Sequence, residues 1–240
     1  MKFENSDIRV VWIDLDDTLV DFRTNSRRAL RRLFDTQNLA PLFGTPGHWT
    51  ECYETYNHAL WDKYNRALIT REQLRTDRFA MPLQEAGVPE MEAIELSARF
   101  DPLYLDFLAR EKALVPGAIE LLERLRTEGV TIGILSNGFK EVQFKKLDNT
   151  GLMPYIDIVV LSDDIGVNKP DIRLYRHAME RTGISDPEAH LMIGDNPSTD
   201  IAGALAAGWH AMLLSDTPAP AQPCFTAPTL HEIMLKIVRE

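Results

Sequence analysis

Residues 8–20 read IRVVWIDLDDTLV, a short apolar run that leads directly into the acids Asp14, Asp16 and Asp17. The run Ile8–Ile13 shows no alternation of apolar and polar residues, which is typical of a parallel strand buried on both faces. Three neighbouring carboxylates repel one another when all are ionised, unless a cation lies between them. The stretch therefore predicts a buried strand whose carboxyl end carries acids that need a cation.

Four more apolar runs follow along the chain and predict an α/β fold. They are Val130–Leu135, Ile156–Leu161, His190–Ile193 and His210–Leu214. Segments with helical periodicity lie before and between them, namely Ala118–Glu128, Phe139–Thr150, Asp171–Thr182 and Ser198–Ala207. Strands that alternate with helices in this way form a doubly wound, Rossmann-like parallel sheet.

The stretch between the first two strands is long and has no strand pattern. From about Asn25 to Arg110 it has the periodicity of four or five helices. A connection of this length within one sheet is unexpected, so a separate inserted domain explains it better. We predict an α/β core of residues 1–20 and 113–240, with an all-helical domain of residues 21–112 inserted after the first strand.

The C-terminal part of the chain predicts a loop followed by one more helix. The loop is indicated by the prolines Pro218, Pro220, Pro223 and Pro228. Thr229 and Glu232 have the spacing of a capping box, in which the two side chains satisfy free amides of the first helical turn. We therefore expect the last helix to begin directly after Thr229.

Composition and charge exclude several classes of partner. The chain has 240 residues and a formal net charge of −10, so polyanions such as nucleic acid polymers and anionic membranes are not expected to bind it. Its two cysteines form no metal-binding pattern, and residues 1–7 lack the apolar run of a secretory signal. We expect a cytoplasmic protein, while its oligomeric state stays open.

Polar and charged residues follow each of the first four predicted strands. Ligands of doubly wound folds bind outside the carboxyl ends of the strands. The residues at these ends are Asp14, Asp16, Thr18, Ser136, Asn137, Lys169, Asp195 and Asp200. Pro170 suits the first position of a helix, which would place Lys169 at a helix N-terminus. Carboxylates suit Mg²⁺, although Mn²⁺ takes the same ligands, and lysine adds a second cation for phosphoryl transfer.

Four motifs in this order resemble the haloacid dehalogenase (HAD) superfamily of phosphohydrolases. They are DLDDT at 14–18, Ser136 in ILSNG, Lys169 in GVNKPD and GDNPSTD at 194–200. The resemblance covers about residues 7–21 and 113–215, and the helical insert resembles the C1 caps of that superfamily. It implies a Mg²⁺-dependent hydrolase of phosphate monoesters that forms an aspartyl-phosphate intermediate.

The resemblance also implies roles for the acids and for Thr18. Asp14 would be the nucleophile and a metal ligand. Asp16 would protonate the leaving oxygen, deprotonate the attacking water and bind the metal through its backbone carbonyl. Thr18 would support the nucleophile loop, and Asp195 would complete the metal ligands. Asp17 is expected to be structural.

The remaining motif residues would bind the phosphate group. By the same resemblance, Ser136 and Lys169 would hold the phosphoryl oxygens, together with Asn137 of the turn after the second strand. Asp200 would orient Lys169 or a metal-bound water. For Asp200 a simpler alternative exists, because an acid near a helix N-terminus is stabilised by the helix dipole alone.

The implied substrate is a small phosphorylated metabolite. The wording DLDDTLVDF, SNGF, GVNKPD and GDNPSTDI is closest to the house-cleaning pyrimidine 5′-nucleotidases, which implies a nucleoside 5′-monophosphate. Sugar phosphatases, including sialic acid 9-phosphatases, are similar in these motifs. A β-phosphoglucomutase-like phosphomutase keeps all four motifs and remains an alternative.

Three further alternatives fit the residues less well. A 2-haloacid dehalogenase uses the same nucleophile but has tyrosine at the position of Asp16. Phosphonoacetaldehyde hydrolysis needs a Schiff-base lysine in the cap, where Lys63 and Lys112 are the two candidates. A catalytically inactive binding scaffold predicts at least one broken motif, and none is broken here.

Overall fold

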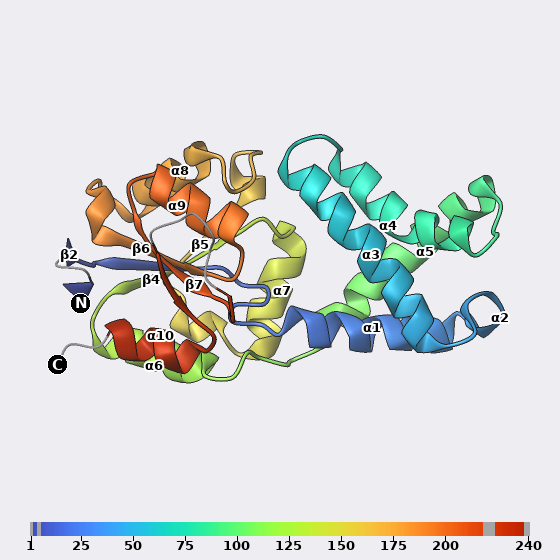
Figure 1. Cartoon of the computed structure of the whole chain (residues 1–240), viewed down its shortest axis with the longest axis horizontal. Helices are drawn as coiled ribbons and strands as arrows, with labels where there is room; N and C mark the ends of the chain where they lie inside the picture. Colours follow the sequence, from blue (N-terminus) through green and yellow to red (C-terminus); the bar gives the residue numbers. More distant parts are fainter. Residues whose placement is uncertain (1, 4–5, 218–223, 238–240) are drawn as a thin grey trace. The chain divides into compact units, whose positions relative to one another are not determined.

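A six-stranded parallel sheet forms the centre of the first of two compact units (Figure 1). Unit 1 comprises Met1–Phe22 and Lys112–Glu240, and unit 2 comprises Arg23–Glu111. The computed structural model describes residues 2–3, 6–217 and 224–237. Three prolines of the loop predicted near the C-terminus, Pro218, Pro220 and Pro223, lie outside the described residues.

The sheet has the strand order β5-β4-β3-β6-β7-β8, with every neighbouring pair parallel. Its strands are β3 (Val10–Ile13), β4 (Thr131–Ser136), β5 (Ile158–Leu161), β6 (His190–Gly194), β7 (His210–Leu214) and β8 (Phe225–Ala227). The first predicted strand, β3, is central, and Val10 lies opposite both Thr131 and His190. A short antiparallel pair, β1 (Lys2–Phe3) and β2 (Ser6–Asp7), precedes it.

Helices cover both faces of this sheet, as predicted for a doubly wound fold (Figure 1). They are α6 (Ala118–Thr127), α7 (Lys140–Thr150), α8 (Ile172–Thr182), α9 (Ala202–Ala206) and α10 (Leu230–Ile237). Residues of β3 alternate between two cores. Val11 and Ile13 pack with α6 and α10, whereas Val10 and Trp12 pack with α8 and α9. The predicted α/β fold class is therefore confirmed, and its core lies on either side of β3.

Several details differ from the sequence-based expectations. β8 was not predicted, because a strand of three residues is too short to show a periodicity. The helix predicted at Ser198–Ala207 begins as a π-helix, Pro197–Ile201, before it continues as α9. Short 3₁₀ turns at Met153–Tyr155, Ser162–Asp164 and Pro187–Ala189 complete unit 1.

The expected helical start at Pro170 is wrong. The side chain of Asp171 accepts a hydrogen bond from the backbone amide of Arg173 (2.9 Å) and caps α8, which therefore begins at Ile172. At the C-terminal helix, the Thr229 hydroxyl accepts the amide of Glu232 at 3.2 Å, as the capping spacing predicted. Lys169 consequently lies in a loop before α8 and not at its first turn.

Unit 2 is entirely helical, as predicted for the insert. Its helices are α1 (Phe22–Thr36), α2 (Ala40–Phe43), α3 (Pro46–Asn65), α4 (Arg71–Glu85) and α5 (Glu90–Ala109). Aromatic rings from α3, α4 and α5 fill its core, with Tyr53 and Phe79 centroids 5.0 Å apart. Beside them, the buried carboxylate of Asp101 is bonded to the guanidinium groups of Arg75 and Arg78.

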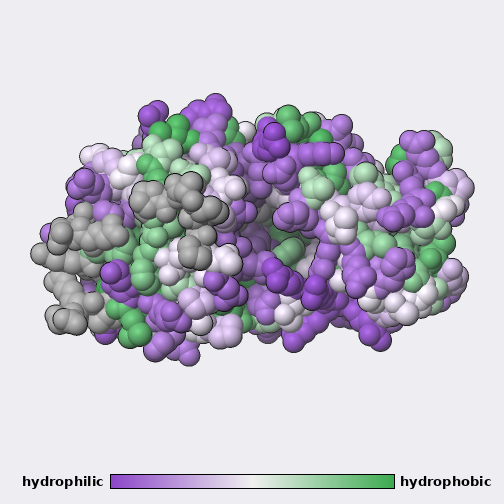
Figure 2. Space-filling model, viewed as in Figure 1, coloured by the Kyte–Doolittle hydropathy of each residue, from purple (hydrophilic) through white to green (hydrophobic). Residues whose placement is uncertain are grey.

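Figure 2 shows mostly hydrophilic residues on the visible face of each unit, with hydrophobic residues in small separate patches. Among the described residues, the large apolar side chains that are exposed include Leu68 in the turn between α3 and α4, Met91 on α5 and Leu235 on α10. No helix in the described part of the chain is long and apolar enough to cross a membrane.

Candidate active site

The carboxyl ends of β3, β4 and β6 place three of the predicted residues at one edge of the sheet. Asp14 directly follows β3, Ser136 ends β4 and Asp195 directly follows β6. The backbone amide of Asp14 donates to Ile193 of β6 at 2.9 Å, which keeps the two strand ends together. Because adjacent parallel strands end at the same edge, residues more than a hundred positions apart become neighbours.

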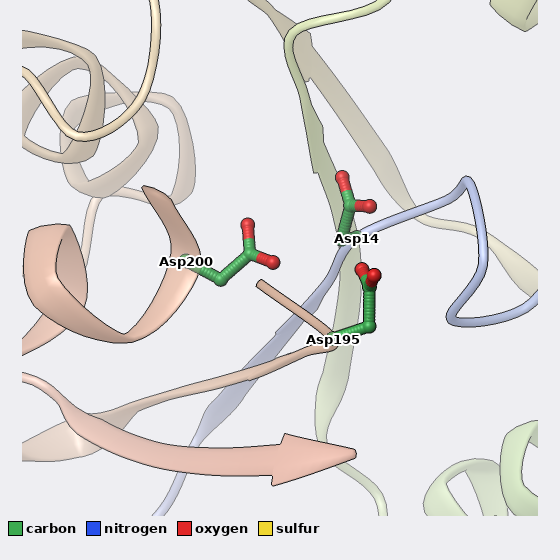
Figure 3. A group of neighbouring side chains, drawn as sticks. All are labelled: Asp14, Asp195 and Asp200. Carbon is green, nitrogen blue, oxygen red and sulfur yellow. The ribbon is translucent and has the colours of Figure 1, made fainter. Parts of the chain in front are cut away.

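Asp14, Asp195 and Asp200 form a compact group of carboxylates. One oxygen of each lies within 4.8 Å of the others, and Figure 3 shows the side chains of Asp195 and Asp200 extending toward Asp14. The ammonium group of Lys169 lies 2.6 Å from Asp14 Oδ1 and 2.6 Å from Asp200 Oδ1. It also donates to the carbonyl of Leu135 at 2.7 Å, which directs all three of its protons to oxygen atoms.

Burial governs the electrostatics of this group. It raises the pKa of Asp14 to about 7, against the opposing charge of Lys169. Burial also raises the pKa of Asp195 to about 8, and the neighbouring Asp14 and Asp200 add to this effect. For Lys169, burial disfavours the charged form, but the two bonded carboxylates outweigh it and raise the pKa of the ammonium group. The lysine is therefore a permanent cation.

Lys169 is held by the turn that follows β4. The side chain of Asn137 accepts a hydrogen bond from the Lys169 amide at 2.7 Å and donates to the Lys169 carbonyl at 3.1 Å. These bonds tie the loop before α8 to the end of β4. The side chain of Asn137 thus positions the lysine backbone, and its predicted contact with substrate phosphate stays a prediction.

Asp200 is held by the π-helix that contains it. Its Oδ2 accepts the amide of Asn196 at 3.0 Å, and its backbone carbonyl accepts the hydroxyl of Tyr175 at 3.2 Å. A Cβ atom on Gly194 would overlap the Asp200 carboxylate, so glycine is required at the end of β6. The wider π turn, Pro197–Ile201, thereby brings the carboxylate back against the strand end.

The loop that follows β3, residues 14–18, presents Asp16 and Thr18 differently from Asp14. The Thr18 hydroxyl is fully buried and donates to Asp195 at 3.3 Å. The Asp16 carboxylate lies outside the group of three acids and is bound by two side chains of α7, Lys146 at 2.6 Å and Gln143 at 3.0 Å. Asp17, which lies between Asp16 and Thr18 in the sequence, has a positive φ of 57°. This backbone conformation is typical of a turn and fits the expected structural role of Asp17.

Gln143 and Lys146 were missed by the sequence analysis. Both lie on α7, and Gln143 also donates to the Ser136 hydroxyl at 2.8 Å. Their signal in the sequence is weak, since a glutamine and a lysine three positions apart are ordinary on any helix. What distinguishes them is burial, because they are 0% and 4% exposed.

The three clustered carboxylates fit a hard divalent cation. Within the described residues, the Lys169 ammonium is bonded to Asp14 and Asp200, whereas Asp195 accepts the Thr18 hydroxyl, so the three acids outnumber the cation beside them. Oxygen ligands and excess negative charge are what Mg²⁺ requires. The raised pKa values of Asp14 and Asp195 have the same origin, namely buried negative charge without full compensation.

Comparisons with known proteins agree on one family. The family model of haloacid dehalogenase-like hydrolases matches residues 8–208. The pyrimidine 5′-nucleotidase YjjG of Escherichia coli is 30% identical over 93% of this chain and 95% of its own length. A phosphoserine phosphatase of Thermus thermophilus is also 30% identical, over 90% of this chain and 92% of its own length.

Solved structures give the same picture. The putative HAD-hydrolase YfnB of Bacillus subtilis, solved with bound magnesium, superimposes with a TM-score of 0.82 at 27% identity. The match covers 95% of this chain and 97% of the YfnB chain. The likeness therefore extends over both units and not over the sheet alone.

Proposed function

The chain belongs to the haloacid dehalogenase-like hydrolase family, and we propose on that premise that it is a Mg²⁺-dependent phosphate monoester hydrolase. The observation that carries the proposal is the convergence of Asp14, Lys169 and Asp200 from three separate segments, with both carboxylates 2.6 Å from the lysine. A fixed cation beside a carboxylate at a strand end suits attack on a phosphoryl group.

The reaction proposed for these residues has two steps. An oxygen of Asp14 attacks the phosphorus atom, the bond from phosphorus to the ester oxygen breaks, and Asp16 gives a proton to the departing oxygen. Water then attacks the same phosphorus atom, gives a proton to Asp16, and the bond from phosphorus to Asp14 breaks. A mixed anhydride of this kind divides one difficult displacement into two easier ones.

Ser136 and Lys169 would hold the phosphoryl oxygens during both steps. Asp14 and Asp195, with the backbone carbonyl of Asp16, would hold Mg²⁺, as the sequence analysis expected. When bound, the ion would neutralise the acids and the charge of the phosphate. The structure adds Asp200 to the carboxylates within reach of a cation, besides its contact with Lys169.

We propose a nucleoside 5′-monophosphate as the substrate, and residues 21–112 as the cap that selects it. The relative YjjG, named a pyrimidine 5′-nucleotidase, supports this choice. The phosphoserine phosphatase is also 30% identical to this chain, so relatives of equal similarity are named for different substrates. A cytoplasmic location belongs to the same proposal.

The test is phosphate release from a panel of monophosphates with Mg²⁺. The panel holds pyrimidine and purine nucleotides, sugar phosphates, phosphoserine and sialic acid 9-phosphate. The wild type, an Asp14→Asn variant and an Asp148→Asn control, in which the changed acid is exposed on α7, are compared. We expect turnover of a nucleotide by the wild type and the control, and none by Asp14→Asn.

Other results separate the alternatives. A sugar phosphate as best substrate would replace the nucleotide in this proposal. Transfer of phosphate to a new position on the sugar, without release, would indicate a phosphomutase. Absence of turnover by a folded wild-type protein with bound Mg²⁺ would refute the hydrolase itself.

A further inference from the structure

Two polar side chains of α7 are buried in the protein interior, where such side chains are rare. Gln143 and Lys146 lie three positions apart, so they share one face of the helix. Gln143 is 0% exposed and Lys146 is 4% exposed. The preceding residue, Lys145, is exposed, as is usual for lysine. A buried lysine or glutamine needs specific partners to offset the loss of water.

Both side chains find these partners on the nucleophile loop. The ammonium of Lys146 lies 2.6 Å from Asp16 Oδ1, and the amide nitrogen of Gln143 lies 3.0 Å from Asp16 Oδ2. Each carboxylate oxygen of Asp16 thus has its own donor. A carboxylate that is bound at both oxygens cannot rotate without breaking a bond. The ammonium also lies 4.8 Å from the ring centre of Phe22, a cation–π contact that fixes it further.

The same amide group fixes the hydroxyl of Ser136. Gln143 Nε2 donates to Ser136 Oγ at 2.8 Å, and the backbone amide of Gly138 donates to it at 3.1 Å. A hydroxyl has two acceptor sites and one proton. With both acceptor sites used, the proton of Ser136 remains to be donated elsewhere. The direction of that proton is therefore set by Gln143 and Gly138.

Close packing keeps Gln143 in this orientation. A Cβ atom on Gly138 would overlap the amide of Gln143, so the turn after β4 leaves no spare room. The opposite amide orientation would place Oε1 against the carboxylate of Asp16, which is repulsive. In the observed one, Oε1 has no hydrogen-bond partner among the described residues. The side chain gives up one bond to make the two bonds to Asp16 and Ser136.

We propose that Gln143 and Lys146 are positioning residues, which hold the Asp16 carboxylate and direct the Ser136 hydroxyl in the proposed phosphate monoester hydrolase. The inference rests on the proposed function. Asp16 transfers a proton to the ester oxygen, so its position matters most when that oxygen departs with difficulty. Ser136 contacts the phosphoryl group, which is common to all substrates.

This reasoning gives a signature that depends on the leaving group. The oxygen of p-nitrophenyl phosphate departs as a stable phenolate and needs little help from an acid. An alkyl oxygen, as in a nucleoside 5′-monophosphate, needs a proton as its bond breaks. A misplaced Asp16 should therefore slow the alkyl ester far more than the nitrophenyl ester. A change in stability alone would slow both esters equally.

The test compares Lys146→Met with Lys145→Met, its exposed neighbour, in the full-length protein with Mg²⁺. We measure kcat/KM for p-nitrophenyl phosphate and for the best alkyl monophosphate, with thermal unfolding recorded for each variant. Proton transfer by a positioned side chain contributes about 10²–10⁴-fold, so we expect Lys146→Met to lose at least ~10-fold more on the alkyl ester. Lys145→Met should match the wild type on both.

Gln143→Asn provides a second route if Lys146→Met does not fold. Asparagine keeps the amide but is one methylene too short to reach both Asp16 and Ser136. We expect a loss on both esters through Ser136, again larger on the alkyl ester through Asp16. Equal losses on the two esters in both variants, or wild-type rates, would overturn the inference while the hydrolase itself stands. A wild type without turnover on either ester would overturn the proposed function and this inference with it.

Discussion

Replacing Asp195 by asparagine should stabilise the metal-free protein at high pH while it abolishes turnover. Burial, with Asp14 and Asp200 nearby, raises the pKa of Asp195 from 3.8 to about 8. Between these two values the native carboxyl holds a proton that the unfolded chain has released. Stability therefore falls as the pH rises from about 4 to about 8. Asparagine has nearly the same shape and carries no charge, so the variant lacks this loss.

The magnitude follows from the two pKa values. One unit of pKa difference corresponds to about 1.4 kcal/mol. With 3.8 for the unfolded chain and about 8 for the native protein, the loss is about 2 kcal/mol at pH 5 and about 5 kcal/mol at pH 8. The stability difference between variant and wild type should thus widen by about 4 kcal/mol. With a urea slope of about 2–3 kcal/mol per M, this is a relative midpoint shift of roughly 1.3–2 M.

The assay is urea denaturation in EDTA at pH 5 and pH 8. Exchange of the amide hydrogens of β3 and β6 reports unit 1 separately from unit 2. Asp148→Asn, a change of an exposed acid, serves as the control. Saturating Mg²⁺ should narrow the difference at pH 8, because a bound cation stabilises the wild-type carboxylates. A difference between Asp195→Asn and wild type that is the same at both pH values would refute the reasoning.

Three other substitutions test buried residues of unit 1 and unit 2. Burial lowers the pKa of His190, whose Nδ1 accepts a hydrogen bond from Trp12 Nε1 at 3.1 Å, so the unfolded chain takes up a proton at a higher pH than the native protein does. The wild type should therefore lose stability relative to His190→Gln as the pH falls below about 6.5, and thermal unfolding at pH 8 and 5.5 measures this loss. Arg78→Met removes a buried partner of Asp101 and should cost about 3 kcal/mol in unit 2, whereas exposed Arg31→Met should cost little in the same urea titration. Gly133→Ala places a Cβ atom in the ring of Trp12 and should cost about 1–3 kcal/mol in unit 1, whereas Gly47→Ala, whose Cβ meets no atom closer than 3.9 Å, should unfold at nearly the wild-type urea concentration.

Five strands of the sheet could be predicted because each is a buried apolar run. Central strands such as β3 are covered on both faces, and burial of that kind leaves a continuous signal in the sequence. The short strands β1, β2 and β8 have two or three residues each, too few to show any period. The π-helix was not predictable either, since Asp200 within it is held by a hydrogen bond from the Asn196 amide that no sequence period indicates.

In the candidate site, too, some features could be predicted from the sequence and others could not. Parallel topology brings strand ends together, so the meeting of Asp14 with Asp195 follows from where the apolar runs stop. The partners of Asp16 do not follow, because Gln143 and Lys146 lie 127 and 130 positions away on a helix face that no strand pattern fixes. Local sequence patterns predict where the strands end, whereas the pairing of side chains that are distant in the sequence can be seen only in the structure.

The discontinuity of unit 1 has a consequence for synthesis on the ribosome. Val10 of β3 pairs with Thr131 and His190, which are translated long after it. At about 5–20 residues per second, β3 emerges roughly 6–24 s before its first partner strand and roughly 9–36 s before its second. All of unit 2 is translated in that interval and can complete its own contacts. The nascent β3 segment, apolar and with both edges unpaired, is therefore a site where chaperones would act and where aggregation would begin.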